Sequence, residues 1–360
     1  MATFTFHANE GATFMCQLDG DAATSCTSPV GYTGLGAGKH TFTVIATDAA
    51  GNSSAPATFD WTIDFEPPET MITSGPVDGS TTTDTSATFA FEGKDNVTSP
   101  ANLDFECKLD AGAFASCASP ASYTTLSRTQ HTFAVRAVDQ AGNEDPEPDS
   151  RKWTVEKLTA VITFGAAPTP THLGGNFTVS ATTTNSDSST LTYSMMSGPC
   201  SWVSGATFSS TGAGICTVKA SGAETTNFQA ASSAQDVTIA KAASTTTFGP
   251  APTPTYLGGN FTVSASNDSG GAITYSAVSG PCALVSGATF SSSGAGSCVV
   301  KAYSAATANY LASWAQQTVT IAKATPTITF GAAPTPTYLG GNFTVSATTT
   351  NTDSPTLTYS

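Results

Sequence analysis

The sequence predicts an all-β chain made of tandem β-sandwich domains, and three observations lead to this fold class. Charged residues make up only 11% of the 360 residues, too few to cover long exposed helices. Threonine, serine, glycine, valine and phenylalanine are abundant, and β-branched and aromatic side chains suit a pleated, half-buried surface. Short segments of alternating apolar and polar residues also recur between turn-forming clusters, which is typical of sandwiches.

A first repeat appears twice. The segment FMCQLDGDAATSC (14–26) returns as FECKLDAGAFASC (105–117), and HTFTVIATDAAGN (40–52) returns as HTFAVRAVDQAGN (131–143), each 91 residues later. A tryptophan, Trp61 or Trp153, follows near the end of each copy. Self-similarity at a fixed period indicates that each copy is one structural unit.

A second repeat appears in two full copies and a stub. FGAAPTPTHLGGNFTVSA begins at Phe164, FGPAPTPTYLGGNFTVSA at Phe248 and FGAAPTPTYLGGNFTVSA at Phe330, in steps of 84 and 82 residues. The motifs SGPC, SGATFSS and GAG recur within each full copy. The back half of the chain is therefore a second array of a different type.

These repeats predict the domain organisation. The expected bounds are 1–64 for an N-terminally truncated domain, 65–157 for a domain of the same type, 158–242 and 243–324 for two domains of the second type, and 325–360 for an incomplete third copy. ATFTF at 2–6 matches ATFAF at 87–91, so the first copy is expected to lack the segment equivalent to about 67–86. Met1 is interpreted as the start of a gene fragment. A half domain such as 325–360 cannot bury a full core and is expected to be frayed.

Strands can be assigned along each repeat. In 131–139, Phe133, Val135 and Ala137 point to one face, and a turn at 139–143 ends the strand. The segment 105–117 is expected to form a hairpin. In the second repeat, VITFG, NFTVSATTT, LTYSMM, ATFSS, ICTVKA and DVTIAK are the expected strands, and the proline-broken APTPT fits an edge or a crossing between sheets. Each full copy is expected to hold six or seven strands.

Eight cysteines fall into four local pairs with duplicated spacing, ten residues apart in two pairs and sixteen in the others. The pairs are Cys16 with Cys26, Cys107 with Cys117, Cys200 with Cys216, and Cys282 with Cys298. No C-x-x-C motif or paired histidine accompanies them, which argues against zinc or thioredoxin-like chemistry. Structural disulfides are predicted, and they indicate an oxidising, extracytoplasmic setting. Closing a loop of about 15 residues stabilises a domain by roughly 3 kcal/mol in the chain-entropy model.

Both repeats resemble known domain types. The first repeat, with FxCxLD, C-x-SP, HTFxVxAxDxAGN and a late tryptophan, resembles bacterial immunoglobulin-like domains of secreted and cell-surface proteins. The second repeat, with ITFG, FTVSA, YS, GxCTV and VTIAK, resembles another bacterial immunoglobulin-like repeat found in long tandem arrays. The resemblance implies an immunoglobulin-like fold and a role as spacer, stalk or adhesive unit. Some such modules accompany enzymatic domains elsewhere in their chains.

The charge is negative and uneven. The net charge is −14, with 21 acidic and 7 basic residues in 1–156 against 5 of each in 157–360. Neither half offers the basic stripe that binding to nucleic acid requires, so a nucleic-acid partner is not expected. No run of eighteen apolar residues is present, so no membrane span is expected in this fragment.

Catalytic machinery is not expected. The four histidines are His7, His40, His131 and His172, and the equivalent positions of His40 and His131 favour a structural role. No Ser-His-Asp or Cys-His constellation repeats with them. The sequence therefore predicts no enzyme, no catalytic residue and no cofactor.

Two acidic segments are candidate cation sites. One is the loop that holds Asp139, Asn143, Glu144, Asp145 and Glu147, and the other is the linker 64–69. In the first copy Asp48 and Asn52 are kept, but serines replace Glu144 and Asp145, so the ligand set is not repeated. The favoured interpretation is a turn capped by aspartate and asparagine, and no metal ligand is assigned. Whether calcium rigidifies the acidic half stays open.

Exposed aromatic side chains are the second kind of candidate. Trp61 and Trp153 recur and are expected in the core, whereas Trp202 and Trp314 are replaced by Leu284 and Ser232 in the other copy. The unshared tryptophans are candidate surface contacts for a ligand such as a glycan. Tyr256 and Tyr338, which correspond to His172, are expected to pack in loops or between repeats. The sequons at Asn176, Asn260 and Asn342 lie at expected strand starts and are interpreted as structural.

The sequence therefore predicts a non-catalytic extracellular or cell-surface spacer array, monomeric, that sets a distance. One alternative is an adhesin segment that binds a glycan or a host cell-surface protein, which an exposed aromatic cluster in one copy would favour. Another is an accessory region of a secreted hydrolase, which predicts a catalytic domain elsewhere in the protein.

Overall fold

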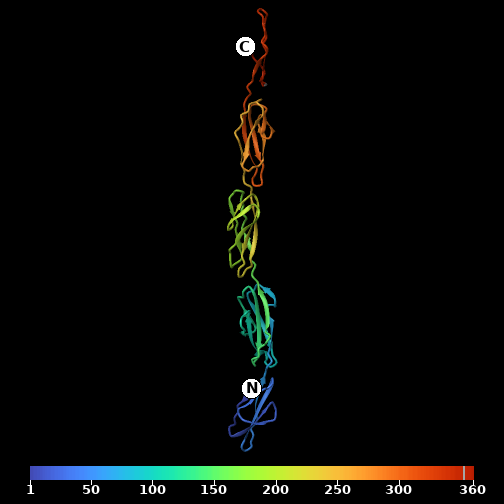
Figure 1. The fold of residues 1–360 in the computed structure, drawn as a ribbon, viewed down its shortest axis with the longest axis vertical. Helices are drawn as coiled ribbons and strands as arrows, with labels where there is room; N and C mark the ends of the chain where they lie inside the picture. The colour runs from blue at the N-terminus through green and yellow to red at the C-terminus, as the bar shows by residue number, and fades with distance from the viewer. Residues whose placement is uncertain (352) are drawn as a thin grey trace. The chain divides into compact units, whose positions relative to one another are not determined.

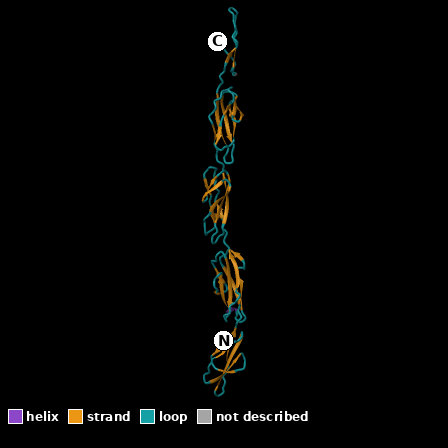
Figure 2. Ribbon diagram, in the orientation of Figure 1, coloured by secondary structure: helices purple, strands orange, loops and turns teal. Residues whose placement is uncertain are grey.

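The computed structural model describes residues 1–351 and 353–360. The chain divides into two compact units, residues 1–159 with 226–229, and residues 160–225 with 230–360. Strands joined by loops make up both units (Figures 1 and 2), and the helical content of the described residues is one 3₁₀ turn, η1 (Pro100–Asn102). That turn is far too short to span a membrane, and the described residues hold no helix that could do so. The all-β prediction is confirmed.

In the first unit, residues 69–155 form eight strands rather than the six or seven expected. They are β7 (Glu69–Ser74), β8 (Ser80–Thr82), β9 (Ala87–Lys94), β10 (Asp104–Leu109), β11 (Ala115–Cys117), β12 (Ala121–Tyr123), β13 (Gln130–Val138) and β14 (Asp149–Val155). One sheet has the order β11-β10-β13-β14-β8 and the other the order β12-β9-β7. Consecutive strands β9 and β10 lie in different sheets, and so do β12 and β13, as in an immunoglobulin-like sandwich.

The core of this sandwich lies between the two sheets. Phe89 of β9 and Phe133 of β13 stack with ring centroids 4.0 Å apart, and Trp153 of β14 packs against Phe89 with only 1% of its surface exposed. Phe133, Val135 and Ala137 are fully buried, as predicted for one face of β13, but Ala134 on the other face is also buried, so the strand is not strictly alternating. Buried aromatic side chains of this size supply most of the apolar area that a small sandwich removes from water.

Residues 1–64 form a smaller version of the same arrangement. The strands are β1 (Ala2–Phe4), β2 (Ala12–Leu18), β3 (Thr24–Cys26), β4 (Val30–Tyr32), β5 (Gly38–Asp48) and β6 (Ala57–Ile63). Their sheets have the orders β3-β2-β5-β6 and β1-β4. Ala2 lies opposite Tyr32, just as Ala87 lies opposite Tyr123, so the two repeats keep the same strand register.

In the second unit, two repeats have equivalent strands. The first set is β15 (Ile162–Phe164), β16 (Asn176–Thr178), β17 (Ala181–Thr183), β18 (Thr192–Ser197), β19 (Cys200–Ser204), β20 (Thr207–Ser210), β21 (Gly214–Gly222) and β22 (Ala231–Ile239). The second set is β23 (Thr246–Phe248), β24 (Phe261–Thr262), β25 (Ala265–Asn267), β26 (Ile273–Ser279), β27 (Cys282–Ser286), β28 (Thr289–Ser292), β29 (Gly296–Ser304) and β30 (Ser313–Ile321). Each set forms a pair, a triplet around β20 or β28, and a triplet around β21 or β29. Fully buried Phe208 and Phe290 occupy the same place in the two cores.

One strand assignment is wrong in this unit. The segment NFTVSATTT, expected as one strand, contains β16 and β17, which belong to different sheets. The chain leaves the first sheet at Val179 and Ser180, so alternation continues across the break while the hydrogen-bonding partners change. The proline-broken segment before it holds no strand, and Thr171 makes only an isolated bridge to Ala240.

The last described strands are β31 (Ile328–Phe330) and β32 (Ala347–Thr349), which form a two-stranded sheet. Apolar side chains of this segment, including Ile328, Phe330 and Phe343, are exposed. The segment therefore contains paired strands without a buried core of its own.

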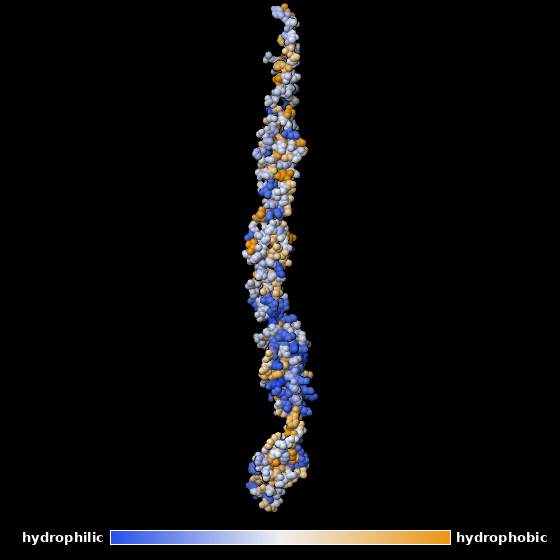
Figure 3. Space-filling view, viewed as in Figure 1, coloured by the Kyte–Doolittle hydropathy of each residue, from blue (hydrophilic) through white to orange (hydrophobic). Residues whose placement is uncertain are grey.

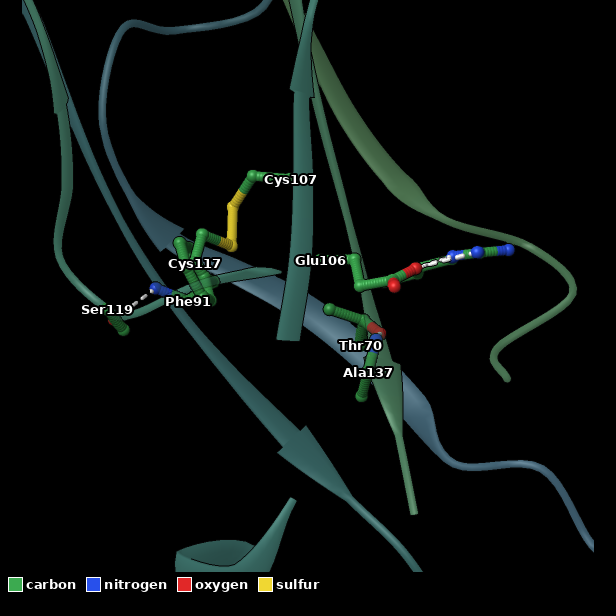
Figure 4. Close-up of a disulfide and its surroundings, with 8 residues drawn as sticks. Thr70, Phe91, Glu106, Cys107, Cys117, Ser119 and Ala137 are labelled. Carbon is green, nitrogen blue, oxygen red and sulfur yellow. Dashed lines mark hydrogen bonds and ion pairs between the residues drawn. A yellow bond between two sulfur atoms is a disulfide. The ribbon is translucent and has the colours of Figure 1, made fainter. Parts of the chain in front are cut away.

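The structure joins the cysteines in four local disulfides, of which two link strands of one sheet and two link strands of different sheets. In the first unit Cys16–Cys26 and Cys107–Cys117 each link two neighbouring strands of one sheet (Figure 4). In the second unit Cys200–Cys216 links β19 to β21, which belong to different sheets of the sandwich, and Cys282–Cys298 does the same between β27 and β29. The second type of repeat thus has a covalent tie across its core.

Candidate functional site

The repeated histidines are held in the same way in both copies. His131 Nδ1 lies 2.9 Å from Asp110 Oδ2, and its Nε2 lies 2.8 Å from the Ser127 carbonyl oxygen. In the first copy His40 Nδ1 lies 2.7 Å from Asp19 Oδ2. Asp110 also accepts the Thr132 backbone N–H, so the pair links the turn after β10 to the start of β13.

These contacts favour the charged form of each histidine. A neutral imidazole donates from only one nitrogen, whereas both nitrogens here face acceptors. Burial acts to lower the pKa of His131, but the Ser127 carbonyl and Asp110 outweigh it and the pKa is raised above 6.5. The Gly36 carbonyl and Asp19 likewise raise the pKa of His40. A histidine that holds both protons in two hydrogen bonds is a poor general base.

The acidic loop predicted as a candidate cation site is not a single ligand set. Glu144 pairs with Arg136, which also binds Glu106 at 2.6 Å. Asp145 is buried and accepts the backbone N–H of Glu147. These carboxylates are therefore used to hold the loop against the sheet.

Asp139 instead meets two carboxylates from elsewhere in the unit. One oxygen each of Asp64, Asp95 and Asp139 lie within 4.8 Å of one another; we call these three the junction carboxylates. Asp64 follows β6, Asp95 follows β9 and Asp139 follows β13. The cluster thus joins the end of one repeat to two loops of the next.

Further contacts hold this junction together. Asn143 Nδ2 donates to the Asp64 carbonyl oxygen at 3.3 Å, and Asn96 Nδ2 donates to Glu66 Oε2 at 2.8 Å. Asn143 also donates from its backbone and its side chain to the two oxygens of Asp139. The linker that the sequence marked as acidic is therefore bound to the loops of 65–157 by asparagine side chains.

The electrostatics of the junction are unbalanced. Asp64 Oδ2 and Asp95 Oδ1 are buried atoms without a hydrogen-bond partner. Burial acts to raise the pKa of Asp139, but donors from Asn143 and the backbone outweigh it and hold the pKa below the ordinary 3.8, so this group is a carboxylate at neutral pH. Figure 3 shows many strongly hydrophilic residues on the surface of the repeat 65–157, which is drawn mainly in teal in Figure 1.

Sequence reasoning named Asp64 and Asp139 in separate candidate sites and missed Asp95. The available signal was its counterpart in the first copy. Phe6 and Phe91 both donate a backbone N–H to an equivalent serine hydroxyl, which aligns Glu10 with Asp95. Glu10 and Asp48 line a hollow of about 220 Å³, so two acidic positions of the junction are repeated.

Of the unshared tryptophans, Trp314 lies in an exposed aromatic pair. It stands opposite Tyr303 in the β29–β30 register, and 58% of Trp314 and 41% of Tyr303 are exposed. Lys301 Nζ lies 4.8 Å from the centre of the Trp314 ring. The equivalent residues in the other copy are Ser221 and Ser232, so the fold does not require aromatic side chains there.

Trp202 is also exposed, at 53%, but its indole N–H donates to the Gly205 carbonyl oxygen of its own turn. It stands opposite Phe208 in the β19–β20 register, but Phe208 is fully buried, so no exposed aromatic pair forms there. The sequons at Asn176, Asn260 and Asn342 are exposed. Asn176 begins β16 and Asn260 directly precedes β24, but the strand start expected at Asn342 is wrong, because the next strand, β32, begins only at Ala347. None of these residues meets another candidate.

A hollow of about 840 Å³ lies beside Tyr256 and Lys323 in the second unit. Its lining residues correspond to those that meet Asn309 and Tyr310 one repeat earlier. There, Asn309 Oδ1 accepts the Ala213 N–H at 2.8 Å and the Tyr310 ring meets His172 with centroids 5.5 Å apart. The hollow is therefore part of a contact surface between successive repeats.

Three solved structures illustrate what the chain is similar to. The fibronectin(III)-like modules of Clostridium thermocellum CbhA are 17% identical, over 43% of this chain and 83% of theirs, with a TM-score of 0.28. The Bacteroides ovatus protein SGBP-B, solved with a mixed-linkage heptasaccharide, is 12% identical, over 73% and 72%, with a TM-score of 0.22. The ICAM-5 D1–D4 ectodomain fragment is 13% identical, over 79% and 84%, with a TM-score of 0.28.

Sequence identities and TM-scores this low do not support any conclusion about function. No family model matches the chain, and no curated protein matches it. The case for function therefore rests on the residues described above.

Proposed function

We propose that this chain is a non-catalytic structural array of immunoglobulin-like domains in a secreted or cell-surface protein, and that it sets a distance between the parts it connects. The observation that carries the proposal is the repeated use of chemically capable side chains for structure. His40 and His131 make the same two hydrogen bonds in both copies, and Asp48 and Asp139 cap the same turn. Side chains that are needed twice by the fold are not specialised for one reaction.

The disulfides support an extracellular location. All eight cysteines are paired, and the pairs recur at equivalent places in each type of repeat. Such bonds form and persist in oxidising compartments. A low content of charged residues is also compatible with a surface that stays soluble through threonine, serine and glycine.

The bounds 1–64, 65–157, 158–242, 243–324 and 325–360 are proposed as the units of this array. The closed hydrogen-bond pattern within each repeat supports them, because few ladder bonds cross the bounds. Short connections between sandwiches limit how far apart two successive repeats can lie.

Small-angle scattering of the full chain and of a variant that lacks residues 243–324 tests the spacer role. The longest strands of that repeat have nine residues, so each repeat is about 30 Å long. A spacer predicts that the deletion shortens the maximum dimension by about 30 to 40 Å. An unchanged maximum dimension would show that the repeats fold back on one another and would contradict the proposal.

A glycan-binding role is the second candidate, because Tyr303 and Trp314 form an exposed aromatic pair that the fold does not require. Flat aromatic faces suit the apolar faces of sugar rings. A glycan array probed with the wild-type chain and with Trp314→Ala decides this point. Binding that Trp314→Ala abolishes, with a change in unfolding free energy within about 0.5 kcal/mol, would establish a lectin surface. Binding to no glycan would leave the spacer role alone.

A further inference from the structure

We infer that the junction carboxylates, Asp64, Asp95 and Asp139, form a calcium site between residues 1–64 and 65–157. The three side chains come from three separate strand ends and converge to within 4.8 Å. Oxygen ligands at 2.3–2.6 Å from one Ca²⁺ lie at most about 5 Å apart, so a single ion can contact all three.

The first argument for an ion is the charge. Three carboxylates this close repel one another, and the repulsion is stronger where water is excluded. His40, His131 and Arg136 form ion pairs with other acids, namely Asp19, Asp110, Glu106 and Glu144. No basic side chain of the described chain pairs with a junction carboxylate, so the charge has no compensation within the protein.

The second argument is independent of the first and concerns hydrogen bonding. Buried carboxylate oxygens nearly always have a partner, because losing water without a replacement is costly. Asp64 Oδ2 and Asp95 Oδ1 are buried and have none, while the other oxygen of each accepts backbone N–H groups. Each side chain is thus oriented by its neighbours with one oxygen left for a further ligand.

The ligand type selects the metal. The donors are carboxylates, with no cysteine or histidine among them, which suits a hard cation rather than zinc or copper. Calcium accepts an irregular set of oxygens and completes its coordination with carbonyl groups and water, whereas magnesium requires near-ideal octahedral geometry. Calcium is therefore the occupant to which the proposal commits.

Bound calcium would link Asp64, at the end of β6, to two loops of the following repeat. This link would hold residues 64–69 against the loops that follow β9 and β13 and would fix the spacing of the first two repeats. That mechanical role rests on the proposed spacer function. Binding itself does not depend on that function. The two can fail separately, because calcium binding and the scattering length are measured in different experiments.

Calorimetric titration of the full chain with CaCl₂, after removal of metals with chelator, tests the site. The wild-type chain is expected to bind one ion with a Kd of about 10⁻⁴ to 10⁻³ M, the range of extracellular modules. Asp95→Asn keeps the oxygen that accepts backbone N–H groups but removes the charge, and it is expected to weaken binding at least about tenfold. Asp64→Asn is expected to do the same.

The first copy supplies matched controls. Glu10→Gln changes the position equivalent to Asp95, and Asp48→Asn changes the position equivalent to Asp139, in a hollow where only two acidic residues meet. Both controls are expected to leave binding within about twofold of wild type. Circular dichroism establishes that each variant is folded. Absence of calcium binding by the wild-type chain, or equal loss in Asp95→Asn and Glu10→Gln, would overturn the site.

Cleavage of the linker tests the stiffening role. Phe65 is 63% exposed and is a chymotrypsin site, so calcium is expected to slow cleavage after Phe65 at least about fivefold, and not in Asp95→Asn. Calcium binding with unchanged cleavage would support the site and overturn its mechanical role.

Discussion

Two histidines at equivalent positions explain how single residues hold the first type of repeat together. His40 and His131 each stand between an aspartate and a backbone carbonyl oxygen, and each ring packs on a tryptophan. Because the charged form makes both hydrogen bonds, each histidine binds its proton more tightly in the folded chain than in the unfolded chain. The pairs are therefore pH-dependent braces.

The unfolding free energy of the first unit is expected to fall as the pH rises above 6.5. The pKa of His40 and of His131 is raised in the folded state, so their contribution is complete below 6.5 and is lost as the pH passes through the folded pKa. Urea denaturation of the full chain between pH 5.5 and 8.5 measures this slope. The double variant His40→Gln, His131→Gln should have a flatter profile, and a slope that survives the double substitution would contradict the assignment.

The structural role of His40 and His131 could be predicted from the sequence, because they occupy equivalent positions in the two copies of the first repeat. The sequence could not show the junction carboxylates as one site. Asp64, Asp95 and Asp139 are distant in sequence, and they meet only because the ends of β6, β9 and β13 lie at the same boundary. That boundary depends on the placement of one repeat on the next, which no local pattern encodes.

At the scale of an element, the glycine of the SGPC motif is required in the turn between β18 and β19. Gly198 has a φ of +97°, and a Cβ atom there would overlap the carbonyl oxygen of Ile215 in β21. The motif recurs at Gly280 with the same geometry. Glycine is therefore required by both the backbone conformation and the close approach of the neighbouring sheet.

Gly198→Ala is expected to destabilise its repeat by more than about 1 kcal/mol, because alanine is strained at positive φ and also collides with β21. Gly175→Ala is the matched control. It has a φ of +90° but no atom near its Cβ position, so it carries the backbone cost alone. Thermal unfolding of both variants compares the two costs, and an equal loss of stability would show that the close approach is unimportant.

The two kinds of disulfide are expected to contribute different amounts to the free energy of unfolding. Cys200–Cys216 closes a span of 16 residues and ties two sheets, whereas Cys107–Cys117 closes 10 residues within one hairpin. Replacing the first pair by alanine should cost about 2–5 kcal/mol, and replacing the second pair should cost less. Chemical denaturation of each double variant measures the difference. A larger loss for the hairpin pair would contradict the role assigned to the tie between sheets.

Most strands were predictable because alternation and turn residues are local signals. The pairing of cysteines was predictable from duplicated spacing, but their placement within or between sheets was not, since it depends on which strand changes sheets. The same reason accounts for NFTVSATTT, in which alternation runs through Val179 and Ser180 while the partner strand changes.

At the scale of the whole molecule, the repeated domain structure supports the proposed role as a spacer. Each of the three full repeats, 65–157, 158–242 and 243–324, closes its own hydrogen-bond ladders around its own core, and a disulfide shortens the length that it can release. A chain of such units resists extension one repeat at a time, which suits a spacer exposed to force outside the cell.

Force–extension measurement on the full chain, held at its two ends, tests the central claim most directly. A structural array predicts separate unfolding events for the repeats. Reduction should lengthen the events by about 30 Å where the disulfide spans 10 residues and by about 50 Å where it spans 16. A featureless extension, or a single event whose length reductant does not change, would contradict an array of independently folded, disulfide-tied domains.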